Sequence, residues 1–459
     1  MPTTTDAALV KAIDKAAHEL TTSAADYSML VDRVGDSPYV LLGEGSHGTH
    51  EFYRERAQVT KRLIEEKGFN IVAIEGDWPD AYRVNCYVRH AIDVDAVDAL
   101  SGFKRFPTWV WRNLEVVEFI EWLRAYNNAL PADVSPSGFY GLALYGLHAS
   151  MQAVLDYLDK VDLELAQRAR AHYACFDQFG LDPQVYGFIA GSHVDRSWQE
   201  GAVQVLVELH RHASELARCE ARETRDEVFS AEQNARVVAN AEAYYRFLFT
   251  GEVSPWNLRD GHMFEALAAH VRRQHRRAKV VVWAHNSHLG DARATAKRER
   301  GELNIGELVR EKHGRNALLV GFTTHHGTVT AASDWGGAAE RRTIRPALAG
   351  SHEALFHEAA LLRFQLIFHP GDRGAARAPP PAGHRRDLSP RDRAREPLFP
   401  GAALRLVRCG AAFRRDACGR AARDPRRMGT RRGSGDIPLC GLAPLEKMEQ
   451  RASLRPARR

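Results

Sequence analysis

Side chains that can take up and release protons follow three of the short apolar runs in this sequence. Glu44 and His47 lie in the loop GEGSHG after the run YVLL, and Glu75 ends the run NIVAIE. His285 and His288 follow the run KVVVWA. Carboxylates beside imidazoles are a set that can work as general acid and base near neutral pH. We therefore predict that Glu44, His47, Glu75 and His285 are catalytic.

The loop GEGSHG also fits one known pattern and nearly fits another, and Glu44 argues against both. G-x-G-x-x-G between a strand and a helix is typical of a dinucleotide site, where N–H groups bind a pyrophosphate. The carboxylate of Glu44 would lie inside that anion site and repel the ligand. A nucleophile elbow needs G-x-S-x-G, and Glu44 stands where its first glycine is required. We interpret His47 as the general base and Ser46 as a residue that shapes the loop.

A metal site is the main alternative for the same histidines. His47, His285, His288 and a glutamate are ligand types that zinc and manganese accept. The sequence has no H-E-x-x-H or similarly short spacing, so we expect neither a metal nor a cofactor. His325 and His326 follow a further apolar run, and we interpret them as ordinary loop residues because no comparable motif supports them.

Five apolar runs alternate with helical patterns, which predicts an α/β fold with a mainly parallel sheet flanked by helices. The runs are YVLLGEGSHG, FNIVAIEGDW, GFYGLALYG, AKVVVWAHNSH and NALLVGFTTHHG. In such a sheet ligands bind beyond the carboxyl ends of the strands, where the candidate residues fall. About residues 150–275 are rich in Ala, Leu, Glu and Arg, which predicts a helical insertion within a domain of residues 1–370.

Two further stretches carry polar or aromatic residues outside the strand ends. FKRFPTWVWRNLEV contains Trp109 and Trp111, which either pack in the core or form an apolar wall for a bulky substrate. SPWNLRDGHMFEAL has the pattern of a helix start, and helix capping is its simplest interpretation. We predict that the substrate is bound by Arg56, His288, Trp109 and Trp111.

Composition limits the class of protein. The chain is 44% hydrophobic and 26% charged, as is usual for soluble globular proteins. No apolar run approaches the roughly 18–20 residues of a membrane span, and the N-terminus lacks the features of a signal peptide. The six cysteines form no C-x-x-C pair, which indicates a reducing compartment. We expect a cytoplasmic protein without membrane association; the sequence does not predict its oligomeric state.

The net charge of +5 arises in the last fifth of the chain. Residues 371–459 hold 22 Lys+Arg and 9 Asp+Glu, whereas residues 1–370 hold 41 and 49. Half of the 20 prolines follow residue 370. This composition predicts a low-order Arg/Pro/Ala-rich tail. Its basic residues lack interleaved aromatics, so we expect no nucleic-acid binding.

Four ordered motifs resemble those of the erythromycin esterase family. They are LLGEGSHGTHEFYRER, GFNIVAIEGDWPDAYRVN, WNLRDGHM and VVVWAHNSHLGDARAT, and the resemblance covers roughly residues 35–365. It implies an α/β sheet with a helical insertion. It also implies metal-independent hydrolysis of a small-molecule carboxylic ester or macrolide-type lactone, and hence a response to antibiotic. Ester hydrolysis is implied more firmly than macrolide resistance.

The resemblance also assigns roles to residues. It implies that His47 is the general base that activates water. It places in the active site Glu44, Arg56, Glu75, His285 and His288. Attack of water on an ester builds negative charge on the carbonyl oxygen, for which Arg56, a protonated His285 or His288, and loop N–H groups are candidate donors. Whether Glu44 or Glu75 orients His47 stays open.

The sequence departs from the family pattern at two places. Members usually carry F-Y-G-L-D, whereas FYGLAL has Ala143 in the position of the aspartate. Members also end with a strand resembling AIGVIYRPETERESHYFP, and GHRRDLSPRDRAREPLFP can be encoded by the same nucleotides read one base out of register. Our hypothesis is a reading-frame slip near residues 366–382. A metal-dependent hydrolase and a non-catalytic family member therefore remain as alternatives.

Overall fold

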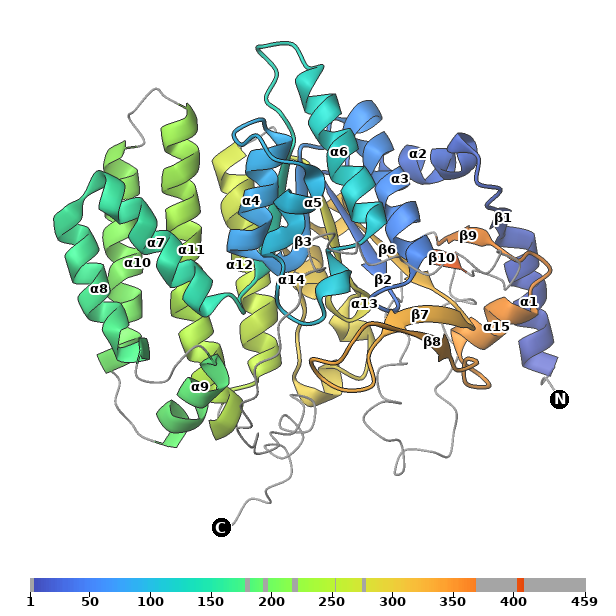
Figure 1. The fold of residues 1–459 in the computed structure, drawn as a ribbon. Coiled ribbons are helices and arrows are strands. Elements are labelled where there is room, and N and C mark those ends of the chain that lie inside the picture. Colours follow the sequence, from blue (N-terminus) through green and yellow to red (C-terminus); the bar gives the residue numbers. More distant parts are fainter. Residues whose placement is uncertain are drawn as a thin grey trace, which may run out of the picture.

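A central sheet organises the chain, in a computed structural model that describes residues 4–177, 182–192, 197–216, 222–251, 253–274, 278–368 and 403–407. Within these residues the sheet has eight strands in the order β1-β9-β10-β6-β2-β5-β3-β4 (Figure 1). The strands are β1 (His18–Glu19), β2 (Tyr39–Glu44), β3 (Ile71–Asp77), β4 (Gly138–Ala143), β5 (Val280–His285), β6 (Ala317–Thr323), β9 (Phe364–Ile367) and β10 (Ala403–Val407). The strands from β10 to β4 pair in parallel, and β9 and β1 pair antiparallel at the other edge. The predicted mainly parallel sheet is confirmed.

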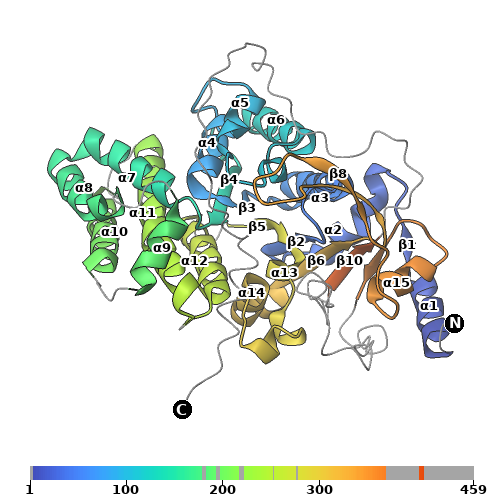
Figure 2. The same cartoon turned by 60° about the horizontal axis from the view of Figure 1, so that its bottom comes forward.

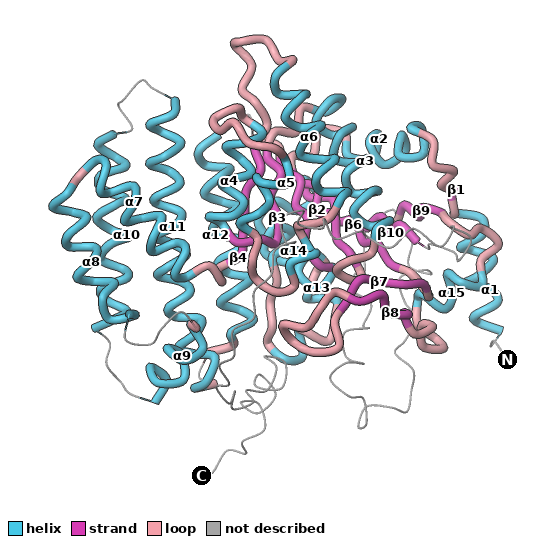
Figure 3. The backbone as a smooth tube through the Cα atoms, viewed as in Figure 1, coloured by secondary structure: helices cyan, strands magenta, loops and turns pink. Residues whose placement is uncertain are grey.

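The two faces of the sheet bury alternate residues of each strand, because successive side chains of a strand point to opposite faces. Val40 and Leu42 of β2 pack in one core with helices α3 and α6, while Leu41 packs in another with α12 and α14. Figure 2 shows these two helix layers on opposite sides of the strands, and Figure 3 shows the sheet between them. Burial on both faces explains why the strands are almost continuously apolar. The helices outside residues 147–250 are α1 (Thr4–Ala16), α2 (Ser28–Val34), α3 (His50–Lys67), α4 (Trp78–Val88), α5 (Ala96–Ala99), α6 (Leu114–Asn128), α12 (Pro255–Gln274), α13 (Asn286–Leu289), α14 (Ile305–His313) and α15 (His352–Glu358).

Helices occupy the predicted insertion between β4 and β5, and most of them form a bundle beyond the β4 edge (Figure 1). They are α7 (Leu147–Val161), α8 (Leu163–Asp177), α9 (Pro183–Ser192), α10 (Ser197–Leu216) and α11 (Arg222–Thr250). The bundle has an apolar core of its own, in which Leu158, Ala235 and Leu248 are buried. A separate core lets this part differ in sequence without disturbing the sheet.

The region after residue 368 contributes one strand to the described structure. β10 lies between β6, with which it pairs in parallel, and β9, with which it pairs antiparallel. This differs from the low-order tail expected from composition, and it supplies a partner for the edge of β6. The remaining residues after 368, including GHRRDLSPRDRAREPLFP, lie outside the described residues. None of the helices in the described part of the chain has the length and apolar character to cross a membrane.

Candidate functional site

The carboxyl ends of three neighbouring strands bring the main candidate residues together. β5 lies between β2 and β3, and Glu44 of β2 is in register with His285 of β5. Glu75 lies where the register of β3 shifts, and such a bulge re-aims side chains at a sheet end. The rings of His47 and His285 are 5.3 Å apart between centroids. The structure thus gathers Glu44, His47, Glu75 and His285 in one place.

The loop after β2 holds His47 at a tight turn that the hairpin β7 (Gly327–Ala331) and β8 (Glu340–Ile344) covers. Gly48 has φ +86°, and a Cβ there would lie 2.4 Å from the carbonyl oxygen of Thr330. The N–H of Thr330 donates to the carbonyl of Gly48 at 3.0 Å. Ser46 Oγ and Thr49 Oγ1 are 2.7 Å apart, which agrees with a loop-shaping role for Ser46. Glycine is required at position 48 for both its conformation and its space.

A buried ion pair fixes the orientation of His47. Nδ1 of His47 lies 2.8 Å from Oε1 of Glu44, whose Oε2 accepts a hydrogen bond from Arg56 Nη2 at 2.8 Å. Because the carboxylate only accepts, Nδ1 of His47 carries the donated proton and Nε2 keeps its lone pair. Burial lowers the pKa of His47, but the hydrogen bond and charge of Glu44, aided by Glu75, outweigh this and raise the pKa above its ordinary value. Glu44 is therefore the carboxylate that orients His47.

Arg56 supports Glu44 from the interior of the protein. Its side chain is 0% exposed, and its guanidinium lies over the rings of Tyr53 and Trp283 at 4.7 and 5.1 Å. This burial argues against the prediction that Arg56 binds substrate or an oxyanion, since no substrate atom can reach it in this conformation. The guanidinium instead supplies the positive charge that a buried Glu44 needs.

His285 is held as a neutral imidazole by its surroundings. Its backbone N–H donates to Glu75 Oε2 at 2.8 Å, and its Nδ1 accepts from the N–H of Ser287 at 3.2 Å. Burial and the neighbouring His47 lower the pKa of His285 to about 4. Of the candidate donors named from sequence, a protonated His285 is therefore not favoured by these surroundings. A neutral ring whose Nδ1 accepts carries its proton on Nε2, which makes His285 a neutral hydrogen-bond donor.

His288 lies between two carboxylates and is almost fully buried. Its Nδ1 is 2.9 Å from each oxygen of Asp260, and its Nε2 is 3.2 Å from Glu75 Oε1. Burial lowers the pKa of His288, but the charges of Asp260 and Glu75 outweigh burial and raise it. Burial in turn raises the pKa of Glu75, but the positive charge of His288 holds it well below its usual range. Both ring nitrogens are engaged, so the prediction that His288 binds substrate does not fit; the residue positions Glu75.

Arg259 and Asp260, which we did not place in the site from sequence, complete this group. Asp260 is 0% exposed and accepts from the N–H of Ile305 at 3.1 Å as well as from His288. Arg259 donates to Tyr145 Oη at 2.5 Å and lies over the ring of Trp256. The motif WNLRDGHM contains both residues and could have indicated them, but we interpreted its polar residues as a helix start.

The family of this chain follows from the match of its sequence to a model of a known protein family. The sequence model described as erythromycin esterase matches residues 64–389, more than half of the chain. The chain belongs to the erythromycin esterase family. This confirms the family resemblance; the matched residues include three of the four motifs, and LLGEGSHGTHEFYRER lies before them.

Two curated relatives of this erythromycin esterase family member share 22% identity with it. One is a putative hydrolase, YbfO, of Bacillus subtilis (strain 168), similar over 70% of this chain and 72% of the relative. The other is erythromycin esterase type II of Escherichia coli, similar over 67% of this chain and 73% of the relative. Family and relatives together indicate a hydrolase.

Three solved structures share the fold. A Bacillus cereus protein has a TM-score of 0.67 at 18% identity and covers 89% of this chain and 98% of its own. A succinoglycan biosynthesis protein has a TM-score of 0.64 at 21% identity, with coverage of 80% and 87%. A mutant of the erythromycin esterase EreC in its open conformation has a TM-score of 0.57 at 17% identity, with coverage of 83% and 92%. The fold is that of erythromycin esterases.

The aromatic residues predicted to line the substrate site support the loops of this family member instead. Trp109 and Trp111 are only 7% and 6% exposed. Trp111 Nε1 donates to the carbonyl of Glu75 at 3.2 Å, and Trp109 packs against Gly48. The predicted wall role does not fit this burial, because both rings face the core.

Ala143, which stands where family members usually carry an aspartate, lies in the sheet and not among the residues gathered around His47. Ala143 is buried and pairs in register with Asp77 of β3. Asp77 accepts from the N–H of Tyr145 at 3.1 Å, and burial raises the pKa of Asp77. Glu44, Glu75 and Asp260 remain as carboxylates of the site, so the group that surrounds His47 does not depend on residue 143.

Proposed function

We propose that this chain hydrolyses a carboxylic ester or macrolide-type lactone with water that His47 activates. The observation that carries the proposal is the fixed pair of Glu44 and His47. Glu44 occupies Nδ1 of the ring, which leaves the lone pair of Nε2 for a water molecule. The His47 side chain is 35% exposed, so that water has access to it.

The reaction can be followed atom by atom. His47 Nε2 takes a proton from water as the water oxygen bonds to the ester carbonyl carbon, and the carbonyl oxygen becomes an oxyanion. His285, neutral with its proton on Nε2, donates a hydrogen bond to that oxyanion. The tetrahedral intermediate then breaks its bond to the alcohol oxygen, which takes the proton from the His47 imidazolium. Glu44 stabilises the imidazolium while it lasts.

A metal-dependent reaction at the same residues is less well supported. A metal ligand needs a free lone pair on the imidazole. Nδ1 of His288 is engaged by Asp260, and its Nε2 lies 3.2 Å from both Glu75 Oε1 and Arg259 Nη2, so neither nitrogen is free for a metal in this arrangement. His47 Nδ1 is likewise engaged by Glu44. Hydrolysis that survives a chelator is the expected result.

The substrate class includes macrolides because a relative is named erythromycin esterase type II. The aromatic surface available for such a ligand is Phe106 with Trp335, whose ring centroids are 4.9 Å apart; Trp335 is 49% exposed. We place the activity in the cytoplasm, in keeping with the scattered cysteines and with Cys86, which is free within the described chain.

The test is a panel of esters, lactones and macrolides with two histidine variants. His47→Ala should abolish turnover of any substrate found. His50→Ala is the matched control, because His50 forms a similar pair with Glu115 and neither residue belongs to the group around His47. Circular dichroism and thermal melting establish that both variants are folded. Turnover retained by folded His47→Ala, or lost equally in both variants, would refute the role of His47.

A further inference from the structure

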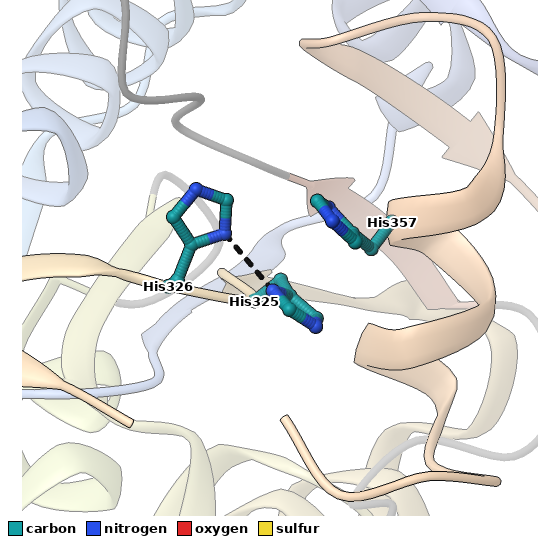
Figure 4. A group of neighbouring side chains, drawn as sticks. All are labelled: His325, His326 and His357. Atoms are coloured by element: carbon teal, nitrogen blue, oxygen red, sulfur yellow. Dashed lines mark hydrogen bonds between the residues drawn. The ribbon is translucent and has the colours of Figure 1, made fainter. Parts of the chain in front are cut away.

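We propose a second site, a structural site for a divalent transition metal of the zinc class, formed by His325, His326 and His357. Figure 4 shows the three imidazoles facing one another, two from the chain after β6 and one from α15. One ligand nitrogen of each lies within 4.8 Å of the others, and all three side chains are half-buried. None of the three belongs to the candidate active site, so this proposal does not depend on the proposed hydrolysis.

Hydrogen bonds hold the backbone of the segment that carries His325 and His326. The carbonyl of His325 accepts from the N–H of Ala347 at 3.0 Å. The carbonyl of His326 accepts from Thr324 Oγ1 at 2.9 Å. Because this backbone is held, His325 and His326 would adjust to a bound metal by rotation of their side chains.

A separate bond joins the two segments. Thr323 Oγ1, at the end of β6, donates to Glu353 Oε1 on α15 at 3.0 Å. Glu353 lies one helical turn before His357, so it faces the same side of α15. The distance between the ligand-bearing segments is thereby set without a metal, as a preformed site requires.

The ligand nitrogens are near the spacing that zinc needs, but the rings of His325 and His357 stack at 10° to each other and would have to turn toward a common point. Zn–N bonds of about 2.0–2.1 Å in a tetrahedral site place ligand nitrogens about 3.3 Å apart. Nδ1 of His325 and Nδ1 of His326 are 2.9 Å apart, and the rings of His325 and His357 stack at 3.8 Å between centroids. A metal would replace the hydrogen bond between the first two rings and draw the third inward by rotation of its side chain.

The donor set decides the class of metal. Three imidazoles suit zinc, cobalt, nickel or copper, whereas magnesium and calcium prefer oxygen ligands. A bound ion would join α15 to the end of β6, against which Gly45 of the catalytic loop packs. Because it binds the folded chain, the ion would stabilise that fold in proportion to its affinity.

The experiment uses the full chain without a histidine tag, stripped with a chelator. Zn²⁺ is titrated calorimetrically, with Mg²⁺ as the second cation, and Co²⁺ absorption reports imidazole coordination. We expect one equivalent of tightly bound Zn²⁺, and a rise in Tm of about 3 °C at 100-fold excess over Kd. Mg²⁺ should produce neither effect.

Variants decide whether these three residues bind the ion. His357→Ala and His326→Asn should each lose the tight equivalent, the Tm rise and the Co²⁺ bands. His210→Ala is the matched control, because His210 is a 67% exposed histidine of α10 and should keep all three. Two variants on different elements guard against a folding defect in one of them, which the Tm of the stripped proteins reveals. Zn²⁺ binding that is the same in wild type and in both folded variants, or absent from wild type, would overturn the proposal.

Discussion

Replacement of Glu44 by glutamine tests the central pair of the proposed reaction. The amide keeps the size of the carboxylate but presents one acceptor and one donor instead of two acceptors. If the amide oxygen faces Arg56, the NH₂ group faces His47 and forces its Nδ1 to accept, which moves the proton to Nε2. If the oxygen faces His47, the NH₂ group meets the guanidinium of Arg56, a donor against a donor in a buried site.

The structure sets two magnitudes for Glu44→Gln. The first geometry puts the proton on the nitrogen that must accept it, and the wrong tautomer of a catalytic histidine lowers kcat by about 10,000-fold. Both geometries leave the charge of Arg56 uncompensated, with the two partners 0% and 1% exposed. Breaking a buried ion pair in this way costs about 3–5 kcal/mol of unfolding free energy.

A double variant separates the two effects. Arg56→Met removes the buried charge and keeps an apolar side chain between Tyr53 and Trp283. Glu44→Gln with Arg56→Met should therefore recover much of the stability that Glu44→Gln loses, but none of the activity. The variant Glu115→Gln is the control, because it alters the corresponding pair with His50 and should leave turnover unchanged.

The assay is hydrolysis of the best substrate from the panel, with urea unfolding measured in parallel on each variant. The reasoning fails if folded Glu44→Gln keeps more than about a tenth of wild-type kcat. It fails equally if the double variant regains activity along with stability, since Glu44 would then act only by neutralising Arg56.

Three other predictions follow from the site. The value of kcat/KM should rise with pH as His47 loses its proton, through a pKa above its ordinary value of about 6.5, and a pH–rate profile of wild type measures this. Asp260→Asn removes a charge that raises the pKa of His288 and so loosens Glu75; we expect kcat lowered about 10- to 100-fold with KM little changed, as is common when a partner that orients a functional side chain is lost. Trp335→Ala should raise KM for a bulky lactone several-fold and leave a small ester unaffected, and equal KM values for both would contradict an aromatic substrate surface.

The fold was largely predictable because it rests on burial patterns that the sequence shows directly. Val280 to Ala284 are buried from both faces, so their continuous apolar run predicts a central strand. The strand β10 was not predictable in the same way. Its residues, ALRLV, lie in a basic, proline-rich region, and their strand partners β6 and β9 are far away in sequence.

The sequence predicts which residues meet at the site but not how deeply each side chain is buried. Strand ends and motifs indicate that Glu44, Glu75 and His285 meet, because parallel strands end at the same edge. They do not indicate depth, so Arg56 looks like a substrate ligand in sequence although its side chain is fully buried. The shift of register in β3 is marked in the sequence only by Gly76, and a glycine within a strand does not indicate that Glu75 turns toward His285.

The imidazoles of His47, His285 and His288 lie near one another but differ in the direction of their pKa shifts. His47 and His288 each have a carboxylate on Nδ1, and both pKa values are raised. His285 has a backbone N–H and a hydroxyl there instead, and burial, aided by the charges of the two neighbouring rings, lowers its pKa to about 4. Environments that push the pKa values of neighbouring groups apart assign them different roles. A base that accepts a proton from water is best placed beside a donor that stays neutral, because a second positive charge would lower the basicity of His47. The division therefore favours His47 as base and His285 as hydrogen-bond donor over the reverse assignment.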